Sequence, residues 1–117
     1  MTALIAAAVV CASPVVHDGD TIRCGRERVR LASIDAPELP GSPKCARPRR
    51  SNGSHPGWCD YRMAAQSRDA LAALLAGQRV LITRQGTDIY GRTLATVSVN
   101  GRDAGAILIA RGLARRW

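Results

Sequence analysis

Residues 16–38 decide the fold, and they read Val-His-Asp-Gly-Asp-Thr-Ile-Arg-Cys-Gly-Arg-Glu-Arg-Val-Arg-Leu-Ala-Ser-Ile-Asp-Ala-Pro-Glu. This stretch holds five of the nine acidic residues of the chain. Asp18-Gly19-Asp20 predicts a hairpin turn, because glycine accepts positive φ and aspartate hydrogen-bonds the turn backbone. A second strand is expected over residues 29–34, and Pro37 ends it because proline lacks an N–H donor. Two strand ends are therefore predicted to present carboxylates.

These carboxylates predict a cation site. Asp20 and Asp35 offer the oxygen ligands that a hard cation such as Ca²⁺ prefers, and a cation would relieve the repulsion between them. Glu38, three residues after Asp35, could lie beside the ion without binding it and accept a proton from water. Arg30 is a candidate to bind phosphate. The alternative interpretation is that these residues are ordinary turn acids and a solvated strand arginine.

Three motifs resemble those of a known family. They are Asp18-Gly19-Asp20-Thr21, Val29-Arg30-Leu31 leading into Ile34-Asp35-Ala36-Pro37-Glu38, and Asp88-Ile89-Tyr90-Gly91-Arg92. In order and spacing they are similar to the motifs of the thermonucleases, the staphylococcal-nuclease-like family. The resemblance covers residues 15–114, and three ordered motifs are far more specific than any one of them.

The resemblance implies both a fold and an activity. The expected fold is mainly β with α (α+β), an OB-like five-stranded barrel with one main helix and a shorter second helix. The expected activity is Ca²⁺-dependent hydrolysis of phosphodiester bonds in DNA or RNA, leaving 3′-phosphate ends. The alternative is a noncatalytic OB-type module that only binds nucleic acid. Such modules usually lose the acids and arginines of these motifs, so their presence favours the enzyme.

The resemblance also assigns a metal site. Ca²⁺ would be held by Asp20, Asp35 and the backbone carbonyl of Ala36, with Asp18 lying beside these ligands. Ala36 stands where the reference enzyme of the family has threonine. A backbone ligand survives that change, whereas a hydrogen bond from a threonine hydroxyl does not.

Catalysis would fall to three side chains. By resemblance, Glu38 acts as the general base, and Arg30 with Arg92 stabilises charge on the phosphate. Tyr90 would lie along the substrate groove. Ile89 replaces a lysine of the family motif, which removes one possible contact with phosphate or nucleotide.

Charge points to the same class of partner. The 117 residues fit one small domain, and 17 basic against 9 acidic residues give a net charge of +8. Arginine stays charged and binds phosphate with two parallel hydrogen bonds, so DNA or RNA is the expected partner. Arginine-rich composition can also reflect codon bias. We expect a monomer.

The N-terminal residues allow several interpretations. Residues 1–10 are apolar but shorter than the roughly 20 residues that span a bilayer, so no stable membrane insertion is expected. They resemble a truncated signal peptide without its basic start. A misplaced start codon and a first barrel strand are the alternatives. We expect residues 1–12 to be such a leader or strand start, residues 13–117 to be the domain, and the protein to be exported, periplasmic or secreted.

The four cysteines predict disulfides. The sequence has no C-x-x-C pair of the kind that zinc sites favour, since its cysteines are Cys11, Cys24, Cys45 and Cys59. Three pairings are possible. We expect Cys11 to pair with Cys24 across the first hairpin and Cys45 with Cys59 to close a long loop, which implies an oxidising compartment. Four reduced thiols are the alternative.

Periodicity predicts the remaining elements. Strands are expected at residues 12–17, 21–24, 28–34, 79–84 and 93–99. Asp60 is predicted to cap a helix over residues 61–76, and Asp103 a shorter one that reaches residue 110 or 111. Residues 39–60 read as a long polar loop, whose basic residues could contact nucleic acid. These basic residues are Lys44, Arg47, Arg49 and Arg50.

Overall fold

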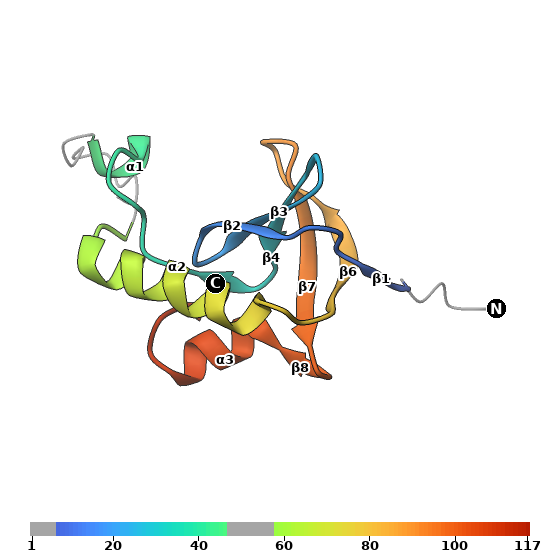
Figure 1. Cartoon of the computed structure of the whole chain (residues 1–117). Helices are drawn as coiled ribbons and strands as arrows, with labels where there is room; N and C mark the ends of the chain where they lie inside the picture. Colours follow the sequence, from blue (N-terminus) through green and yellow to red (C-terminus); the bar gives the residue numbers. More distant parts are fainter. Residues whose placement is uncertain (1–6, 47–57) are drawn as a thin grey trace.

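The computed structural model describes residues 7–46 and 58–117. A twisted sheet lies beside two helices, α2 and α3, which pack on one side of it (Figure 1). In chain order, the elements are β1 (Ala8–Val10), β2 (Val15–Asp18), β3 (Thr21–Cys24), β4 (Glu27–Leu31), β5 (Ile34–Asp35), α1 (Pro43–Ala46), α2 (Tyr61–Leu75), β6 (Val80–Thr87), β7 (Thr93–Val99), β8 (Arg102–Asp103), α3 (Ala104–Ala110) and β9 (Arg115–Arg116).

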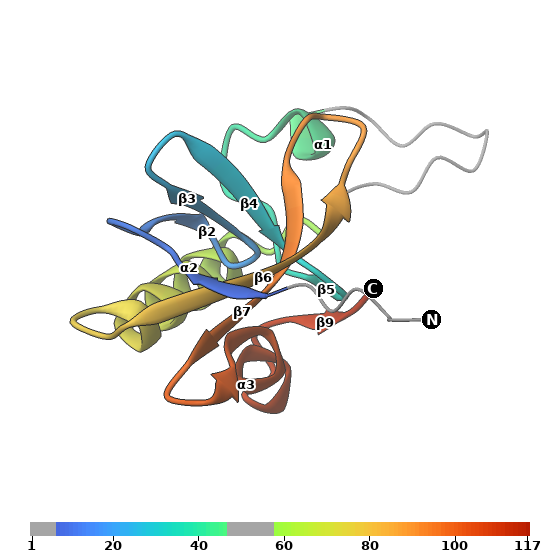
Figure 2. The same ribbon diagram turned by 90° about the vertical axis from the view of Figure 1, so that its right-hand side faces the viewer.

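The main sheet has seven strands. Six follow the order β1-β6-β7-β4-β3-β2, and β8 pairs with β7. The β4–β7 pair is parallel and the other pairs are antiparallel. Figure 2 shows the strong twist of the sheet, in which the strands run in clearly different directions. The predicted fold class, mainly β with helices, is confirmed.

The expected closure into a five-stranded barrel is not complete in the described residues. The two edge strands, β1 and β2, are consecutive in the chain and are joined by residues 11–14 rather than by a ladder. Ser13 has a φ of 49°, which turns the chain, and Pro14 has no N–H to donate. The sheet is therefore open at this seam.

The core is aliphatic, as expected for a chain without phenylalanine. In β4, Val29 and Leu31 are fully buried, while Arg28 and Arg30 between and beside them point to the opposite face. Leu71 of α2, Ile82 of β6 and Val97 of β7 meet the β4 side chains in the same cluster. Members buried to the same degree are Ile22, Val80, Ala95, Ala104 and Leu108.

Both predicted helices are confirmed, together with their caps. The Asp60 carboxylate accepts a hydrogen bond from the backbone N–H of Met63 at 3.0 Å, and the helix ends one residue before the predicted limit. The Asp103 carboxylate accepts from the N–H of Ala106 at 3.0 Å. These short polar side chains satisfy backbone donors that would otherwise have no partner inside the helix.

Both predicted disulfides are present. Cys11 bonds to Cys24 and Cys45 to Cys59, with Cα–Cα distances of 5.1 and 5.7 Å. The alternative of four reduced thiols is therefore wrong for this structure. The first bond ties the seam between β1 and β2 to the end of β3.

The predicted loop at residues 39–60 contains one short helix, α1, that the sequence analysis did not foresee. The basic residues Arg47, Arg49 and Arg50 of this loop lie outside the described residues, as do residues 1–6 of the apolar leader. Residues 8–10 of the leader form β1, which pairs with β6. None of the helices in residues 7–46 and 58–117 has the length and apolar character needed to cross a membrane.

Candidate functional site

The turn between β2 and β3 carries two carboxylates in a tight bend. The side chain of Asp18 accepts a hydrogen bond from the backbone N–H of Asp20 at 3.0 Å. Between them, a Cβ on Gly19 would lie 1.9 Å from the Ser67 hydroxyl oxygen of α2 and 2.7 Å from the Ala36 Cβ. Only glycine fits there, so the turn is pressed against both the long helix and the chain after β5.

Asp20 and Asp35 come together across this contact. Asp20 is 7% exposed and Asp35 is 8% exposed. One oxygen of Asp20 accepts from the backbone N–H of Ala36 at 2.9 Å, and the other accepts from the Thr21 hydroxyl at 3.0 Å. The hydrogen bond to Ala36 fixes the turn relative to the end of β5. The structure thus places the two carboxylates that were expected to share a cation on adjoining strand ends.

The Arg30 side chain lies between these two carboxylates. Its Nη2 is 3.6 Å from Asp20 Oδ2 and 3.9 Å from Asp35 Oδ1. Its Nη1 donates to the carbonyl oxygens of Leu31 at 2.9 Å and Ile34 at 2.7 Å. The side chain is only 13% exposed. Arg30 is therefore held in one orientation and offsets the charge of two buried acids.

Glu38 joins Asp18, Asp20 and Asp35 to form what we call the acidic group. Its backbone N–H donates to the Trp58 carbonyl at 2.6 Å, and its carboxylate accepts from the Ser42 hydroxyl at 3.2 Å. Burial, together with the negative charges of Asp20 and Glu38, raises the pKa of Asp18 to about 7. The cause shows that Asp18, Asp20 and Glu38 share one region of negative potential.

Arg115, which the sequence analysis did not single out, also reaches this group. Its Nε donates a hydrogen bond to Asp35 Oδ2 at 3.0 Å, and its Nη2 forms an ion pair with the same oxygen at 2.9 Å. The guanidinium also lies 4.7 Å from the centroid of the Trp58 ring. The pairing of β5 with β9, with Asp35 opposite Arg115, creates this contact. Because 80 residues separate the two, no local pattern could have indicated it.

Tyr90 and Arg92 form a separate group on the loop between β6 and β7. Arg92 Nε bonds to Asp88 Oδ2 at 2.7 Å, and the other Asp88 oxygen accepts from the backbone N–H groups of Tyr90 and Arg92 at 2.9 Å. Although burial opposes it, the hydrogen bonds from Arg92 and Tyr90 hold the pKa of Asp88 below its usual value. The Arg92 guanidinium also lies 5.5 Å from the Tyr90 ring centroid.

The structure thus brings together most of the predicted site but not all of it. Four charged side chains meet around the end of β5. The Arg92 side chain is not among them, and its hydrogen bond is to Asp88. The four are Asp18, Asp20, Arg30 and Asp35, with Glu38 beside them.

The donor set fits a hard cation. Asp20 and Asp35 supply oxygen atoms from buried side chains, the type of ligand that Ca²⁺ prefers, although Arg30 and Arg115 already offset part of their charge. In the part of the chain that the structure describes, no cluster of three or more His, Cys, Asp or Glu side chains has the arrangement of a metal site. Backbone carbonyl, water or substrate oxygens would have to complete the ligands.

Comparisons with known proteins point to one family. The family model described as staphylococcal nuclease homologue matches residues 28–117. The succinoglycan biosynthesis protein ExoI of Rhizobium meliloti is 37% identical over 99 residues, covering 83% of this chain and 47% of that protein. The protein ParB of Escherichia coli is 33% identical over 112 residues, covering 85% and 52%. An uncharacterized endonuclease of Haemophilus influenzae is 28% identical over 109 residues, covering 89% and 50%. The chain spans about half the length of these relatives.

Proposed function

Because the chain belongs to the staphylococcal nuclease homologue family, we propose that it is a nuclease that hydrolyses phosphodiester bonds of DNA or RNA, with Ca²⁺ as its cofactor. The observation that carries this proposal is Arg30, which is held between the buried carboxylates of Asp20 and Asp35. The guanidinium of Arg30 is thus a fixed positive charge directly beside the proposed site for Ca²⁺. Such an arrangement suits a phosphate group that is bound from both sides.

Asp20, Asp35 and the backbone carbonyl of Ala36 would hold the ion. A bound hard cation polarises the phosphodiester and lowers the pKa of water. The chain's own contribution is to fix the ligands. The Ala36 N–H orients Asp20, and Arg115 orients Asp35. Asp18 holds the turn through the Asp20 backbone rather than binding the ion.

Glu38 would act as the general base. Its carboxylate is oriented by the Ser42 hydroxyl, and its backbone is fixed by the Trp58 carbonyl, so a base would be held beside the proposed ion. Arg30 would stabilise charge on the phosphate. Arg92 would add a second guanidinium through its terminal NH₂ groups, while its Nε stays bonded to Asp88. Attack that breaks the 5′ P–O bond would leave the 3′-phosphate ends that we propose as products.

Two further properties follow as proposals. Two disulfides are consistent with an oxidising compartment, so we place the protein outside the cytoplasm. We also propose that it acts as a monomer. Fractionation of cells and sedimentation of the purified protein would check these two points.

A noncatalytic binding module is the second candidate. The ion pairs of Asp35 with Arg30 and Arg115 favour it, because they already offset the charge of an acid that would otherwise hold the ion. A cleavage assay separates the two functions. Plasmid and single-stranded DNA are incubated with Ca²⁺, with Mg²⁺ or with chelator, and we expect cleavage with Ca²⁺ and none with chelator.

Variants identify the site in the same assay. Asp20→Asn should raise the Ca²⁺ concentration needed for half-maximal cleavage and slow the reaction. Asp69→Asn, an exposed acid on α2, is the matched control and should behave like the unmodified protein. Binding of DNA without cleavage under any divalent ion would establish the module instead.

A further inference from the structure

Two arginines outside the candidate site stand directly opposite each other on neighbouring strands. Arg23 of β3 and Arg28 of β4 are Cα partners in the antiparallel ladder, and both are exposed. Arg28 lies two residues before Arg30 in the same strand, so the two project from the same face. The opposite face of β4 carries the buried Val29 and Leu31.

This pair lacks the carboxylate partners that some other arginines have. Like charges directly opposite each other in a sheet destabilise it. Arg84 is paired with Glu27 at 2.6 Å and Arg68 with Asp69 at 3.0 Å. Within residues 7–46 and 58–117, no carboxylate forms an ion pair with Arg23 or Arg28. A bound polyanion would remove this repulsion.

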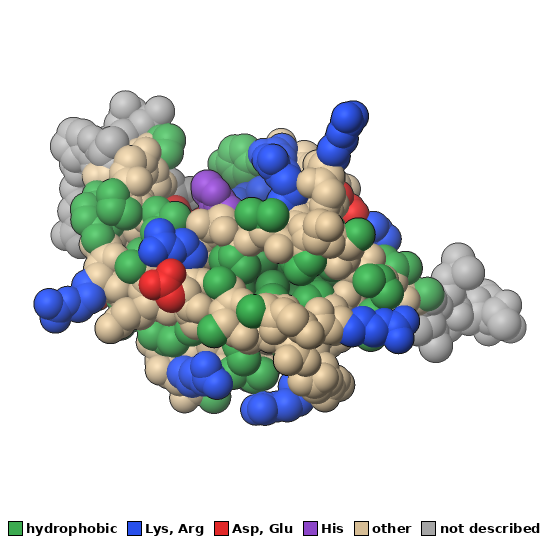
Figure 3. All heavy atoms as spheres, viewed as in Figure 1, with side chains coloured by type: hydrophobic (Ala, Val, Ile, Leu, Met, Phe, Trp, Pro, Cys, Tyr) green, Lys and Arg blue, Asp and Glu red, His purple; other side chains and the backbone are tan. Residues whose placement is uncertain are grey.

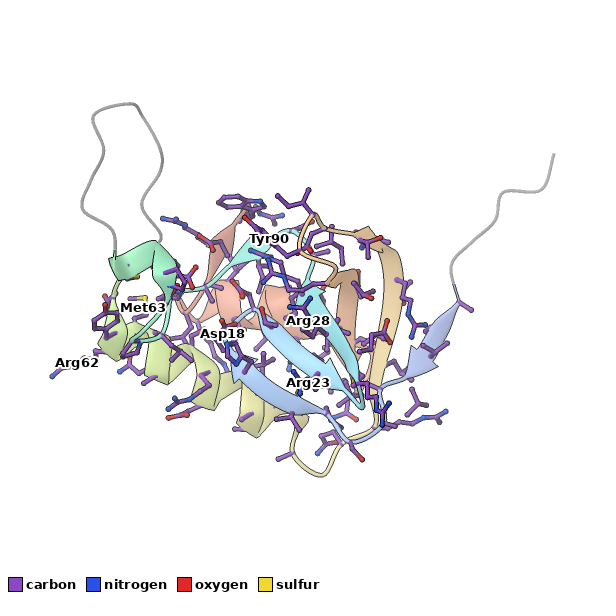
Figure 4. The ribbon with its side chains drawn as sticks, turned by 90° about the horizontal axis from the view of Figure 1, so that it is seen from above. Asp18, Arg23, Arg28, Arg62, Met63 and Tyr90 are labelled. Carbon is purple, nitrogen blue, oxygen red and sulfur yellow. A yellow bond between two sulfur atoms is a disulfide. The ribbon has the colours of Figure 1, made fainter. Side chains whose placement is uncertain are left out.

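Arg28 also supports the tip of the loop between β6 and β7. Its Nη2 donates to the Tyr90 carbonyl at 2.6 Å. At this tip Tyr90 is 63% exposed and Ile89 is 91% exposed. Figure 4 shows Asp18, Arg23, Arg28 and Tyr90 on the face turned toward the viewer, while Arg62 extends away at the start of α2. The loop tip that carries these two exposed side chains is thus held by Arg28.

We propose that Arg23 and Arg28 form a phosphate subsite for a single-stranded nucleic acid whose reacting phosphodiester lies at Arg30. This inference rests on the proposed function. Two residues of a strand span about 7 Å, so the subsite would take a phosphate neighbouring the one at Arg30. Tyr90 and Ile89 would contact an unpaired base, since the flat faces of bases are available for stacking only when the strand is not paired.

The test is a binding measurement without cleavage. A labelled single strand of about 12 nucleotides, within the range that one OB fold covers, is titrated in chelator at several salt concentrations. Arg23→Gln and Arg28→Gln should each weaken binding about 2- to 10-fold. Each should also reduce the slope of log affinity against log salt by about 0.7, the value for one lost phosphate contact on a single strand.

Two controls separate a local contact from a loss of total charge. Arg62→Gln removes one exposed charge from α2 and should leave both affinity and slope nearly unchanged. Arg23→Lys keeps the charge and should retain most of the slope. Thermal unfolding of Arg23→Gln should show no loss of stability, because the substitution removes a repulsion.

Two results would overturn the inference. One is equal behaviour of Arg23→Gln and Arg62→Gln, and the other is duplex binding as tight as that of the single strand. Because chelator prevents cleavage, the outcome is independent of catalysis. A protein that binds through Arg23 and Arg28 but never cleaves would keep the subsite and refute the proposed hydrolysis.

Discussion

At the scale of single residues, Gly19 shows how the acid-bearing turn is fixed. Gly19→Ala should lower the free energy of unfolding by about 1–3 kcal/mol, because the added Cβ would overlap Ser67 and Ala36. Chemical denaturation measures this. Gly86→Ala is the matched control, since a Cβ there meets nothing within 4 Å, and it should change stability little. Equal stability of both variants would show that the turn can move away from α2.

Glu27 provides a prediction about pH. Hydrogen bonds from Arg84 and Thr93 lower the pKa of Glu27 to about 2. A group whose pKa is lowered on folding adds stability above its unfolded value, and this is lost as pH falls toward the folded value. Glu27→Gln should therefore lower the melting temperature by up to about 5 °C at pH 7, with the difference shrinking between pH 4.5 and 2. A difference that does not change with pH would contradict this account.

Residues of the candidate site differ in how far sequence could place them. Asp20 and Asp35 stand out because turn chemistry and proline put acids at strand ends. Arg115 could not be found, because its contact with Asp35 depends on the pairing of two-residue strands. Trp58 could not be found either, because it meets Glu38 and Arg115 only in the folded chain. Arg92 belongs to a recognisable motif, so its position could be predicted. The sequence does not show, however, that its guanidinium bonds to Asp88.

At the scale of elements, the disulfide between Cys45 and Cys59 supports the carboxylates of the candidate site through the neighbouring Trp58. Trp58 precedes Cys59 and contacts the site twice, through the Glu38 N–H and through Arg115. Because the disulfide fixes the chain next to Trp58, it stabilises the position of Glu38 as well as the fold.

Replacing both cysteines of this loop should affect activity and stability together. The Cys45→Ser, Cys59→Ser protein should lose about 3 kcal/mol of stability, the chain-entropy value for a loop of about 15 residues. It should also cleave DNA more slowly than the Cys11→Ser, Cys24→Ser protein, which loses a disulfide of similar span, with a sequence separation of 13 rather than 14. Circular dichroism checks that both proteins are folded at the assay temperature. Equal rates would show that the loop does not position the site.

Helices and strands were predictable to different degrees for physical reasons. The starts of α2 and α3 follow from local capping by Asp60 and Asp103, which the sequence shows directly. The two-residue strands β5 and β9 carry no period of their own, and they form only because distant residues meet. The seam between β1 and β2 depends on the positive φ of Ser13, which a serine seldom adopts.

At the scale of the whole molecule, the charge distribution matches the proposed substrate. The chain has a net charge of +8, yet it contains a small cluster of acidic side chains. Two of these acids, Asp20 and Asp35, are paired with Arg30. On the face seen in Figure 3, basic side chains are spread around the molecule and acidic ones are few. Such a field attracts nucleic acid from a distance, while the buried acids confine the cation to one place.

The central claim is that Glu38 serves chemistry rather than binding, and one substitution tests it most directly. Glu38→Gln keeps the size of the side chain and can still accept a hydrogen bond from Ser42, but it cannot take a proton from water. Turnover with Ca²⁺ should fall by about 10² to 10⁴. Glu27→Gln, at the chain's other glutamate, is the matched control and should cleave at nearly the unmodified rate.

The decisive measurement is the cleavage rate of Glu38→Gln alongside its DNA affinity in chelator. The account predicts a large loss of rate with affinity unchanged or slightly higher, since removing a negative charge near phosphate reduces repulsion. Cleavage by Glu38→Gln at the unmodified rate would contradict it.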